Sequence, residues 1–350
     1  MAVFTAIDDA GIFFNSVLYT GTGTTHTITG VGFQPDFVWG KCRSQAQSHR
    51  AIDAVRGGDK VLYPDLSNVE GTDSELITSF NSDGYVMGTS GTNANDNTET
   101  YVSWNWKAGT TSGIATNVST DITPSAYSFN QTSRFSVIKY SGNSGVSATV
   151  AHGLGVTPAM FAVKNLGNTD SWEIYHQNSN AVPEDYLLQF NTNGGAIDNS
   201  DFWADTAPDS VNITLGIDDG INGSYDYVAY CFADVQGFSK FGGYTGNGDA
   251  DGAFVYTGFR PAYVCVKKTS DTGDWYTYDN KREGYNTDNN ALYIDLTNAE
   301  STSEDIDILS NGFKLRGTNA EINGDGGTYI YMAFAESPFV NSEGVPTNAR

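Results

Sequence analysis

Residues 62–72 read Leu-Tyr-Pro-Asp-Leu-Ser-Asn-Val-Glu-Gly-Thr, and residues 292–302 read Leu-Tyr-Ile-Asp-Leu-Thr-Asn-Ala-Glu-Ser-Thr. Such a match within one chain indicates an internal repeat, and a repeated segment corresponds to a repeated structural unit. The identical pairs are Leu62 and Leu292, Tyr63 and Tyr293, Asp65 and Asp295, Leu66 and Leu296, Asn68 and Asn298, Glu70 and Glu300, and Thr72 and Thr302. We therefore interpret both fold and function in terms of a repeated module.

The match extends on both sides of these stretches. Upstream, residues 32–38 correspond to residues 258–264, and downstream, residues 81–85 correspond to residues 309–313. A third copy lies between the two, marked by Tyr140-Ser141-Gly142, Lys164, Trp172 and Asp226-Tyr227-Val228. The sequence thus predicts three modules of about 100 residues each, an ordinary size for a small domain.

The predicted organisation places these modules between short connecting segments. We expect an N-terminal segment (1–18), module 1 (19–109), a linker (110–134), module 2 (135–234), a linker (235–243), module 3 (244–337) and a C-terminal tail (338–350). The first linker is rich in Ser and Thr, and the second spans only a few residues. Short connections favour modules that pack on one another.

The composition indicates an all-β fold. The chain has 39 Gly, 20 Tyr and 19 Phe but only 17% charged residues, and polar turn-forming residues separate its short apolar runs. Several runs, such as residues 37–39 and 227–232, are apolar on both faces, which is typical of central strands in packed sheets. Helical periodicity is nearly absent. We expect at most a turn or two of helix, within residues 9–18 and near residues 70–80.

The net charge excludes several classes of partner. It is −23, the pI is about 4.2, and Lys and Arg do not cluster, so we expect binding neither to nucleic acid nor to an anionic membrane surface. No run of 18 apolar residues occurs, and residues 1–9 lack the basic start and apolar core of a secretion signal. We expect a protein that is made in a cytoplasm and does not insert into a membrane.

The sequence lacks the motifs of common catalytic sites. It contains no nucleophile elbow, Walker loop or phosphate-cradling glycine loop, and its four His residues lack the spacing of metal ligands. We therefore expect a protein without catalytic activity. A carboxylate pair of the glycosidase type could still assemble in space, which leaves a glycan-degrading enzyme as an alternative. The three cysteines, Cys42, Cys231 and Cys265, are expected to be free and buried thiols.

One loop resembles the first half of a calcium-binding loop. Asn247, Asp249 and Asp251 place oxygen-bearing side chains at alternate positions, and Gly252 is the sixth residue. The twelfth position, where a bidentate Glu is expected, is Gly258. The loop is therefore either a calcium site or an ordinary Asp/Gly hairpin turn. Calcium is the one cofactor that the sequence suggests.

The six tryptophans are candidates either for sugar stacking or for the core. Trp104 and Trp106 share one face of a strand, and Trp172 and Trp275 recur at matching positions, which favours packing. Trp203 lies in a turn-like stretch without a counterpart in the other modules. We predict that Trp203 is the exposed aromatic and the candidate glycan-binding residue.

Taken together, these residues resemble a known family. The segments that carry the resemblance are residues 7–9 with 19–21, residues 32–39, residues 49–57, residues 80–84, Trp104-Asn105-Trp106-Lys107-Ala108-Gly109 and the closing residues 329–339. They are similar to a repeat-containing family of virion proteins from tailed, often marine, bacteriophages, over nearly all of the chain. The resemblance implies β-sandwich modules, of jelly-roll or concanavalin-like type, in a fibre, knob or head-decoration component. It implies no catalytic residues.

Two functions remain open besides the enzyme. In the first, the chain is a structural protein on the surface of the virion that binds other virion proteins, including copies of itself. In the second, it is a tail-fibre adhesin whose loops bind glycans of the host surface. The large surfaces of sandwich modules favour the first, and we expect interfaces well above the roughly 1,000 Å² of a specific contact.

Overall fold

The computed structural model describes residues 5–89, 94–282, 286, 290–302 and 306–348, and the prediction of an all-β fold is confirmed. Within these residues every pairing between two strands is antiparallel. The helices are single turns: η1 (Ala10–Ile12), η2 (Pro183–Asp185), α1 (Ser200–Trp203), α2 (Asp219–Asn222) and α3 (Ala320–Asn323). None of the described helices has the length and apolar character needed to cross a membrane.

Each module contains a main sheet, and the strand order recurs from one main sheet to the next. In module 1 the order is β1 (Phe14–Thr20), β9 (Thr100–Trp106), β3 (Phe37–Cys42) and β4 (Arg50–Asp53). In module 2 it is β10 (Ala126–Asn130), β11 (Phe135–Ser141), β18 (Asp226–Phe232), β13 (Met160–Asn165), β14 (Glu173–His176), β15 (Tyr186–Gln189) and β16 (Ile197–Asp198). In module 3 it is β19 (Ser239–Thr245), β26 (Thr328–Pro338), β21 (Phe259–Lys268), β22 (Tyr276–Asp279) and β23 (Leu292–Tyr293).

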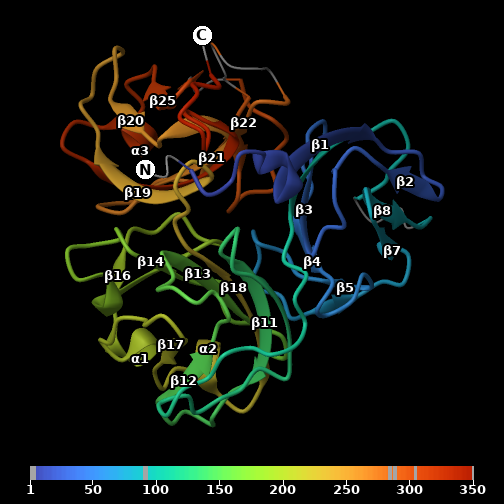
Figure 1. The fold of residues 1–350 in the computed structure, drawn as a ribbon, viewed down its shortest axis with the longest axis vertical. Helices are drawn as coiled ribbons and strands as arrows, with labels where there is room; N and C mark the ends of the chain where they lie inside the picture. The colour runs from blue at the N-terminus through green and yellow to red at the C-terminus, as the bar shows by residue number, and fades with distance from the viewer. Residues whose placement is uncertain (1–4, 90–93, 283–285, 287–289, 303–305, 349–350) are drawn as a thin grey trace.

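A smaller sheet lies on one face of each main sheet. These small sheets are β2 (His26–Ile28), β8 (Gly84–Met87) and β7 (Ile77–Asn81); β12 (Ala148–Ala151) and β17 (Asn212–Leu215); and β20 (Phe254–Tyr256), β25 (Gly312–Leu315) and β24 (Ile306–Leu309). Module 1 also has the short pair β5 (Lys60–Val61) and β6 (Gly71–Thr72). Figure 1 shows the resulting three lobes around a common centre, with the small sheets pointing outward.

Residues matched in the sequence occupy equivalent registers. Lys41 pairs with Val102, Lys164 with Val228 and Lys267 with Ile330, each between the same two strands of its main sheet. Leu62 and Leu292 likewise pair with Ala51 and Thr277, which hold corresponding places in modules 1 and 3.

A steric constraint explains why glycine occurs at two matched positions. Gly84 and Gly312 open β8 and β25, where the backbone of the neighbouring strand passes very close. A β-carbon on Gly84 would lie 2.2 Å from the carbonyl oxygen of Ile28. The same atom on Gly312 would lie 2.0 Å from the carbonyl oxygen of Val255. Only glycine permits this approach, which explains why Gly recurs in the downstream repeat segment.

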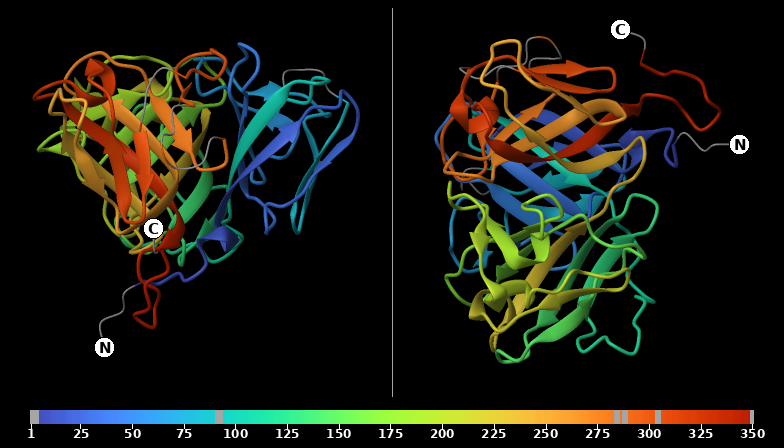
Figure 2. Two further views of the ribbon diagram at one scale, coloured as in Figure 1. Left: turned by 90° about the horizontal axis from the view of Figure 1, so that it is seen from above. Right: turned by 90° about the vertical axis from the view of Figure 1, so that its left-hand side faces the viewer.

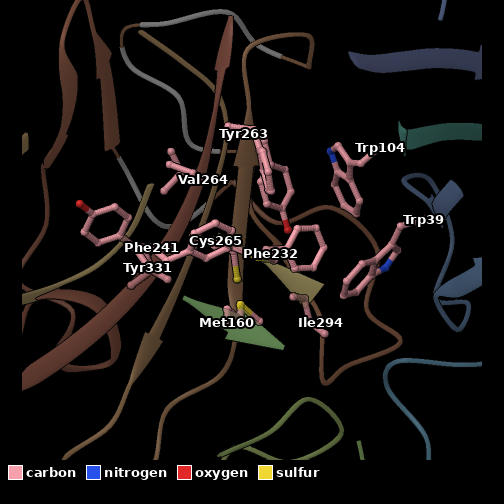
Figure 3. Close-up of a cluster of buried hydrophobic side chains, with 14 of the residues drawn as sticks. Trp39, Trp104, Met160, Phe232, Phe241, Tyr263, Val264, Cys265, Ile294 and Tyr331 are labelled. Atoms are coloured by element: carbon pink, nitrogen blue, oxygen red, sulfur yellow. The ribbon is translucent and has the colours of Figure 1, made fainter. Parts of the chain in front are cut away.

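The main sheets are buried on both faces, because each lies between its own small sheet and the common centre. In β3, Val38 packs in the core of module 1, whereas Phe37 and Trp39 join the central core. In β13, Phe161 packs in the core of module 2, whereas Met160 joins the central core. Figure 3 shows side chains of all three modules meeting in this centre. The runs that are apolar on both faces follow from this arrangement.

The strands extend beyond the module boundaries expected from the sequence. β1 begins at Phe14 inside the predicted N-terminal segment, β10 lies inside the predicted linker 110–134, and β19 begins at Ser239 inside the predicted linker 235–243. The expectation of at most a turn or two of helix is confirmed, and only the first of the two candidate stretches contains a helical turn. Residues 9–18 contain the single turn η1 followed by β1, and residues 70–80 contain β6 and part of β7 instead of a helix. In the second stretch the capping pattern does not start a helix. The side chain and the carbonyl of Asp73 accept the N–H groups of Glu75 and Leu76, which closes a single turn between two strands.

The segments next to the chain ends lie side by side on one face of the molecule (Figure 2). Asp8 accepts hydrogen bonds from the backbone N–H and the hydroxyl of Ser342, at 2.7 and 2.6 Å. Thr5 donates its hydroxyl to the carbonyl of Gln236, in the short connection between modules 2 and 3. The three cysteines are free and buried, as predicted.

Candidate functional site

The prediction that Trp203 is an exposed glycan platform is wrong. Trp203 ends the single turn α1, and only 1% of its surface is exposed. Its ring packs edge-on against Phe161, and its Nε1–H donates to the carbonyl of Tyr186 at 3.0 Å. Residues 200–203 form a turn, as the sequence suggests, but the Trp203 side chain of this turn points into the protein core. An indole in this position closes the core of module 2.

The candidate calcium loop is held together as a turn. The side chain of Asn247 accepts the N–H of Asp249, and the side chain of Asp249 accepts the N–H of Asp251. Asp251 forms ion pairs with Lys314 at 2.6 Å and Arg316 at 3.3 Å. The structure therefore directs the three side chains to backbone donors and cations. Across the described residues, no group of three or more His, Cys, Asp and Glu side chains could hold a metal ion.

A buried lysine connects each module to a neighbouring one. Lys41, Lys164 and Lys267 are at most 1% exposed, and each donates from Nζ to a backbone carbonyl of another module. We call residues 63–70, 189–196 and 293–300, which contain these carbonyls, the junction loops. The bonds are Lys41 to Thr297 (3.1 Å), Lys164 to Ser67 (3.1 Å) and Lys267 to Asn193 (3.2 Å).

A second contact of the same pattern uses an aromatic ring nitrogen. His49, Trp172 and Trp275 occupy matched positions, since the N–H of each is accepted by the side chain of Asp65, Asn191 or Asp295, respectively. Each ring contacts the first carbonyl of a junction loop. The contacts are His49 to Tyr293 (2.6 Å), Trp172 to Tyr63 (2.9 Å) and Trp275 to Gln189 (2.9 Å).

A third contact joins backbone to backbone and closes the set. The last residue of each junction loop donates its N–H to the carbonyl two residues after the buried lysine of the adjoining module. The bonds are Glu70 to Leu166 (3.1 Å), Ala196 to Thr269 (2.8 Å) and Glu300 to Arg43 (2.8 Å). Module 1 thus contacts module 2, module 2 contacts module 3, and module 3 contacts module 1. Three head-to-tail junctions that close in this way form a ring.

Aromatic rings fill the centre of this ring. Trp106, Phe232 and Phe334 hold corresponding places on β9, β18 and β26, one from each module. Every pair among them is in contact, with ring centroids 6.2 Å apart for Trp106 and Phe232, 5.4 Å for Trp106 and Phe334, and 5.8 Å for Phe232 and Phe334. The three modules are therefore arranged with approximate threefold symmetry about these three side chains. Figure 1 shows the corresponding three lobes.

Two buried ion pairs reinforce the junctions. Arg56 binds Asp53 at 2.6 Å and Arg282 binds Asp279 at 2.7 Å, and these four side chains are at most 1% exposed. Each aspartate also accepts a hydrogen bond from another module. Tyr230 donates to Asp53 at 2.7 Å, and Trp104 donates to Asp279 at 3.0 Å. In module 2 the corresponding residue is His176, whose Nε2 contacts the carbonyl of Tyr331 at 3.2 Å.

The electrostatics of these groups follow from burial. Burial lowers the pKa of Lys41, Lys164 and Lys267 to about 8. An amine of this kind in an open pocket would be a nucleophile, but here each Nζ is buried and also donates to a carbonyl of its own module. Burial also lowers the pKa of His49. Because its Nδ1 accepts the indole N–H of Trp39, the proton of the neutral ring lies on Nε2, toward Tyr293.

The sequence marked these residues without revealing what they do. Lys41, Lys164 and Lys267, and Trp172 with Trp275, were markers of the repeat, and the expectation that the tryptophans pack in the core is confirmed. Their contacts across the junctions were missed. The available signal was a lysine that recurs at the end of three apolar strands, where an unpaired charge would be costly.

One junction contains a pair of carboxyl groups. Asp274 and Asp295 share a hydrogen bond at the contact of modules 2 and 3. At the corresponding positions, module 1 has the hydrogen-bonded pair Ser48 and Asp65, and module 2 has the pair Ser171 and Asn191. Burial, together with the neighbouring Asp274, raises the pKa of Asp295 to about 7. The folded state therefore holds this proton more tightly than the unfolded chain does.

We expect the change Asp295→Asn to increase the free energy of unfolding at pH 8 by about 2 kcal/mol. Each pKa unit corresponds to about 1.4 kcal/mol, and the destabilisation is divided between the two carboxyl groups, Asp274 and Asp295. The raised pKa stabilises the fold fully below the ordinary carboxyl pKa of 3.8, and this contribution is lost as the pH rises toward 7. Urea unfolding between pH 4 and 8 measures the difference from the original chain. Asp271→Asn is the control, because its side chain is 69% exposed. A constant difference across this range would contradict the prediction.

Comparison with known proteins assigns the chain to a family whose function is unknown. No curated protein matches the chain. Residues 9–338 match a domain of unknown function, DUF7483, and this match spans the three modules and the junctions between them. The chain therefore belongs to the DUF7483 family.

Proposed function

We propose that this chain is a structural protein on the surface of a tailed-bacteriophage particle and that it acts by binding other proteins. The observation that carries the proposal is the closed ring of junctions. It joins three sandwich modules into one body whose buried lysines, imidazoles and ion pairs contact backbone and side chains of neighbouring modules. Such a body holds its surfaces in fixed relative positions, which a component of an ordered particle requires.

The polar groups inside the molecule support a mechanical role. Lys164 alone donates to the carbonyls of Ser67, Asn165 and Asp170, so one side chain holds both its own module and the junction loop of module 1. Buried charges with complete hydrogen bonding specify one arrangement, because any other arrangement would leave them unpaired.

The outward surfaces are where partners would bind. The small sheets and their loops project from the centre (Figure 1), and large apolar side chains such as Val146, Ile217 and Phe254 are exposed there. The partners we propose are other virion proteins and further copies of this chain, through interfaces above roughly 1,000 Å². The net charge of −23 favours partners with basic or neutral contact surfaces. The sequence resemblance to phage virion proteins supports the same assignment.

Purified virions test the proposal. We expect mass spectrometry of washed particles to find the chain at many copies, and a particle map to place the three-lobed body at a fixed position. Absence of the chain from the particles would contradict the structural role. Turnover of a polysaccharide by the purified protein would contradict the proposal of a role without catalysis.

A further inference from the structure

Module 3 differs from the other two at its outer edge strand. In β20, Phe254 is 47% exposed and Tyr256 is 60% exposed, whereas Val255 between them is buried. Val255 pairs with Phe313 as Ile28 pairs with Tyr85 in module 1 and Val150 pairs with Ile213 in module 2. This register places Thr29 and Ala151 at the position of Tyr256. An exposed aromatic here is therefore a feature of one module and is not needed for the shared fold.

Tyr256 lines the opening of a cavity of about 360 Å³. The cavity lies where three segments meet: the connection 234–240, the end of β20, and the residues that follow β26. The hydroxyl end of Tyr256 lies near Gly258, since a β-carbon on that glycine would come within 3.6 Å of the Tyr256 hydroxyl oxygen. The residue exposes 60% of its surface, so the ring is accessible to a ligand.

Polar side chains line the same cavity. Asp234 accepts the N–H of Phe241 at 2.8 Å through one oxygen, and its other oxygen pairs with Lys240 at 3.3 Å. The Asp234 and Lys240 side chains are 35% and 43% exposed, so both still reach solvent in the cavity. Gln236, which also lines the cavity, is exposed. The cavity therefore combines an exposed aromatic ring with a carboxylate, an ammonium group and an amide.

We propose that this cavity binds a neutral saccharide of about two sugar rings, with Tyr256 as the stacking platform. The C–H face of a pyranose is apolar and packs on the negative face of an aromatic ring, while its hydroxyl groups need donors and acceptors at the rim. Asp234, Lys240 and Gln236 supply these groups. The net charge of −23 repels acidic polysaccharides, which selects neutral sugars. The inference goes beyond the proposed particle role and does not depend on it.

Saturation-transfer NMR and calorimetry with the full chain test the proposal, using maltose, cellobiose, lactose and chitobiose as probes. We expect saturable binding of at least one of them. We expect Tyr256→Ala to weaken that binding about tenfold, the effect of losing one aromatic stacking contact. Gln236→Ala removes a hydrogen-bonding amide from the rim, and we expect it to weaken binding about fivefold.

Phe254→Ala is the matched control, because Phe254 is an exposed aromatic on the same strand but outside the cavity. It should change the affinity by less than about twofold, and the thermal midpoints of all variants should agree, since the replaced side chains are exposed. Failure of all four sugars to bind would overturn the proposal. So would equal losses in Tyr256→Ala and Phe254→Ala, or equally strong binding of polygalacturonate. Each of these results would leave the location of the chain in virions unaffected.

Discussion

Replacing Arg56 by methionine should destabilise the folded chain by about 3 to 5 kcal/mol. The change removes the partner of Asp53, whose side chain is fully buried, and leaves a carboxylate in the junction with only neutral donors. Although burial disfavours the charged guanidinium, Asp53 and Tyr230 raise the pKa of Arg56 above its usual value. Arg56 also donates to the carbonyl of Ala51 at 3.0 Å and to Tyr230 at 3.1 Å. Urea unfolding monitored by circular dichroism measures the loss.

The double change Asp53→Asn with Arg56→Met distinguishes a broken ion pair from lost packing. It should recover a large part of the stability, because no fully buried charge is left unpaired. Glu70, which Arg56 also binds at 3.1 Å, has a side chain that is 21% exposed and can be hydrated. Module 2 already has neutral residues, His176 and Ser179, at the corresponding positions. Lys60→Met is the surface control, since Lys60 and its partner Asp59 are 30% and 43% exposed, and it should change stability by less than about 1 kcal/mol. A loss below about 1 kcal/mol in Arg56→Met would refute the prediction.

Replacing Trp106 by alanine should cost about 3 to 5 kcal/mol, the usual cost of emptying a buried aromatic site. Trp106 is 1% exposed and touches Phe232 and Phe334 at the centre of the ring. Because the cavity would open against all three modules, we expect them to lose stability together, in one transition at a lower temperature. Calorimetry measures the midpoint and the number of transitions.

Trp106→Phe is the matched variant, because modules 2 and 3 have phenylalanine at this position. The indole N–H of Trp106 is buried and has no acceptor among the described residues, so its removal offsets part of the lost packing. We expect a change within about 1 kcal/mol. Separate transitions for individual modules in Trp106→Ala would show that the centre does not couple them.

Local patterns predicted the fold class because they report local physics. The alternation of short apolar runs and turn residues follows from the geometry of strands, and it predicted an all-β chain. The matched lysines and tryptophans occupy equivalent registers because each module pairs its strands in the same order. Boundaries were less accurate, since β1 and β19 begin within segments that look like connections and pair with strands far along the chain.

The exposure of single aromatic side chains could not be predicted from the sequence, because exposure is not a local property. Trp203 lies in a turn, and turns are usually on the surface, yet the side chain points into the core of module 2. Tyr256 lies in an apolar alternating strand, which favours burial, yet it is exposed because β20 is an edge strand on the outer face. The calcium pattern matched ligand spacing, but nearby backbone and cations bind Asn247, Asp249 and Asp251.

The all-β class, the repeated module and the acidic character can be inferred from the amino-acid sequence, because residue type, spacing and charge act through neighbours in the chain. The closure of the modules into a ring is apparent only from the three-dimensional structure. The bonds of Lys41 to Thr297 and His49 to Tyr293 join residues more than 240 positions apart. The donors and acceptors of such contacts are common residue types and backbone carbonyls, and their pairing depends on the orientation of whole modules, for which no local pattern exists.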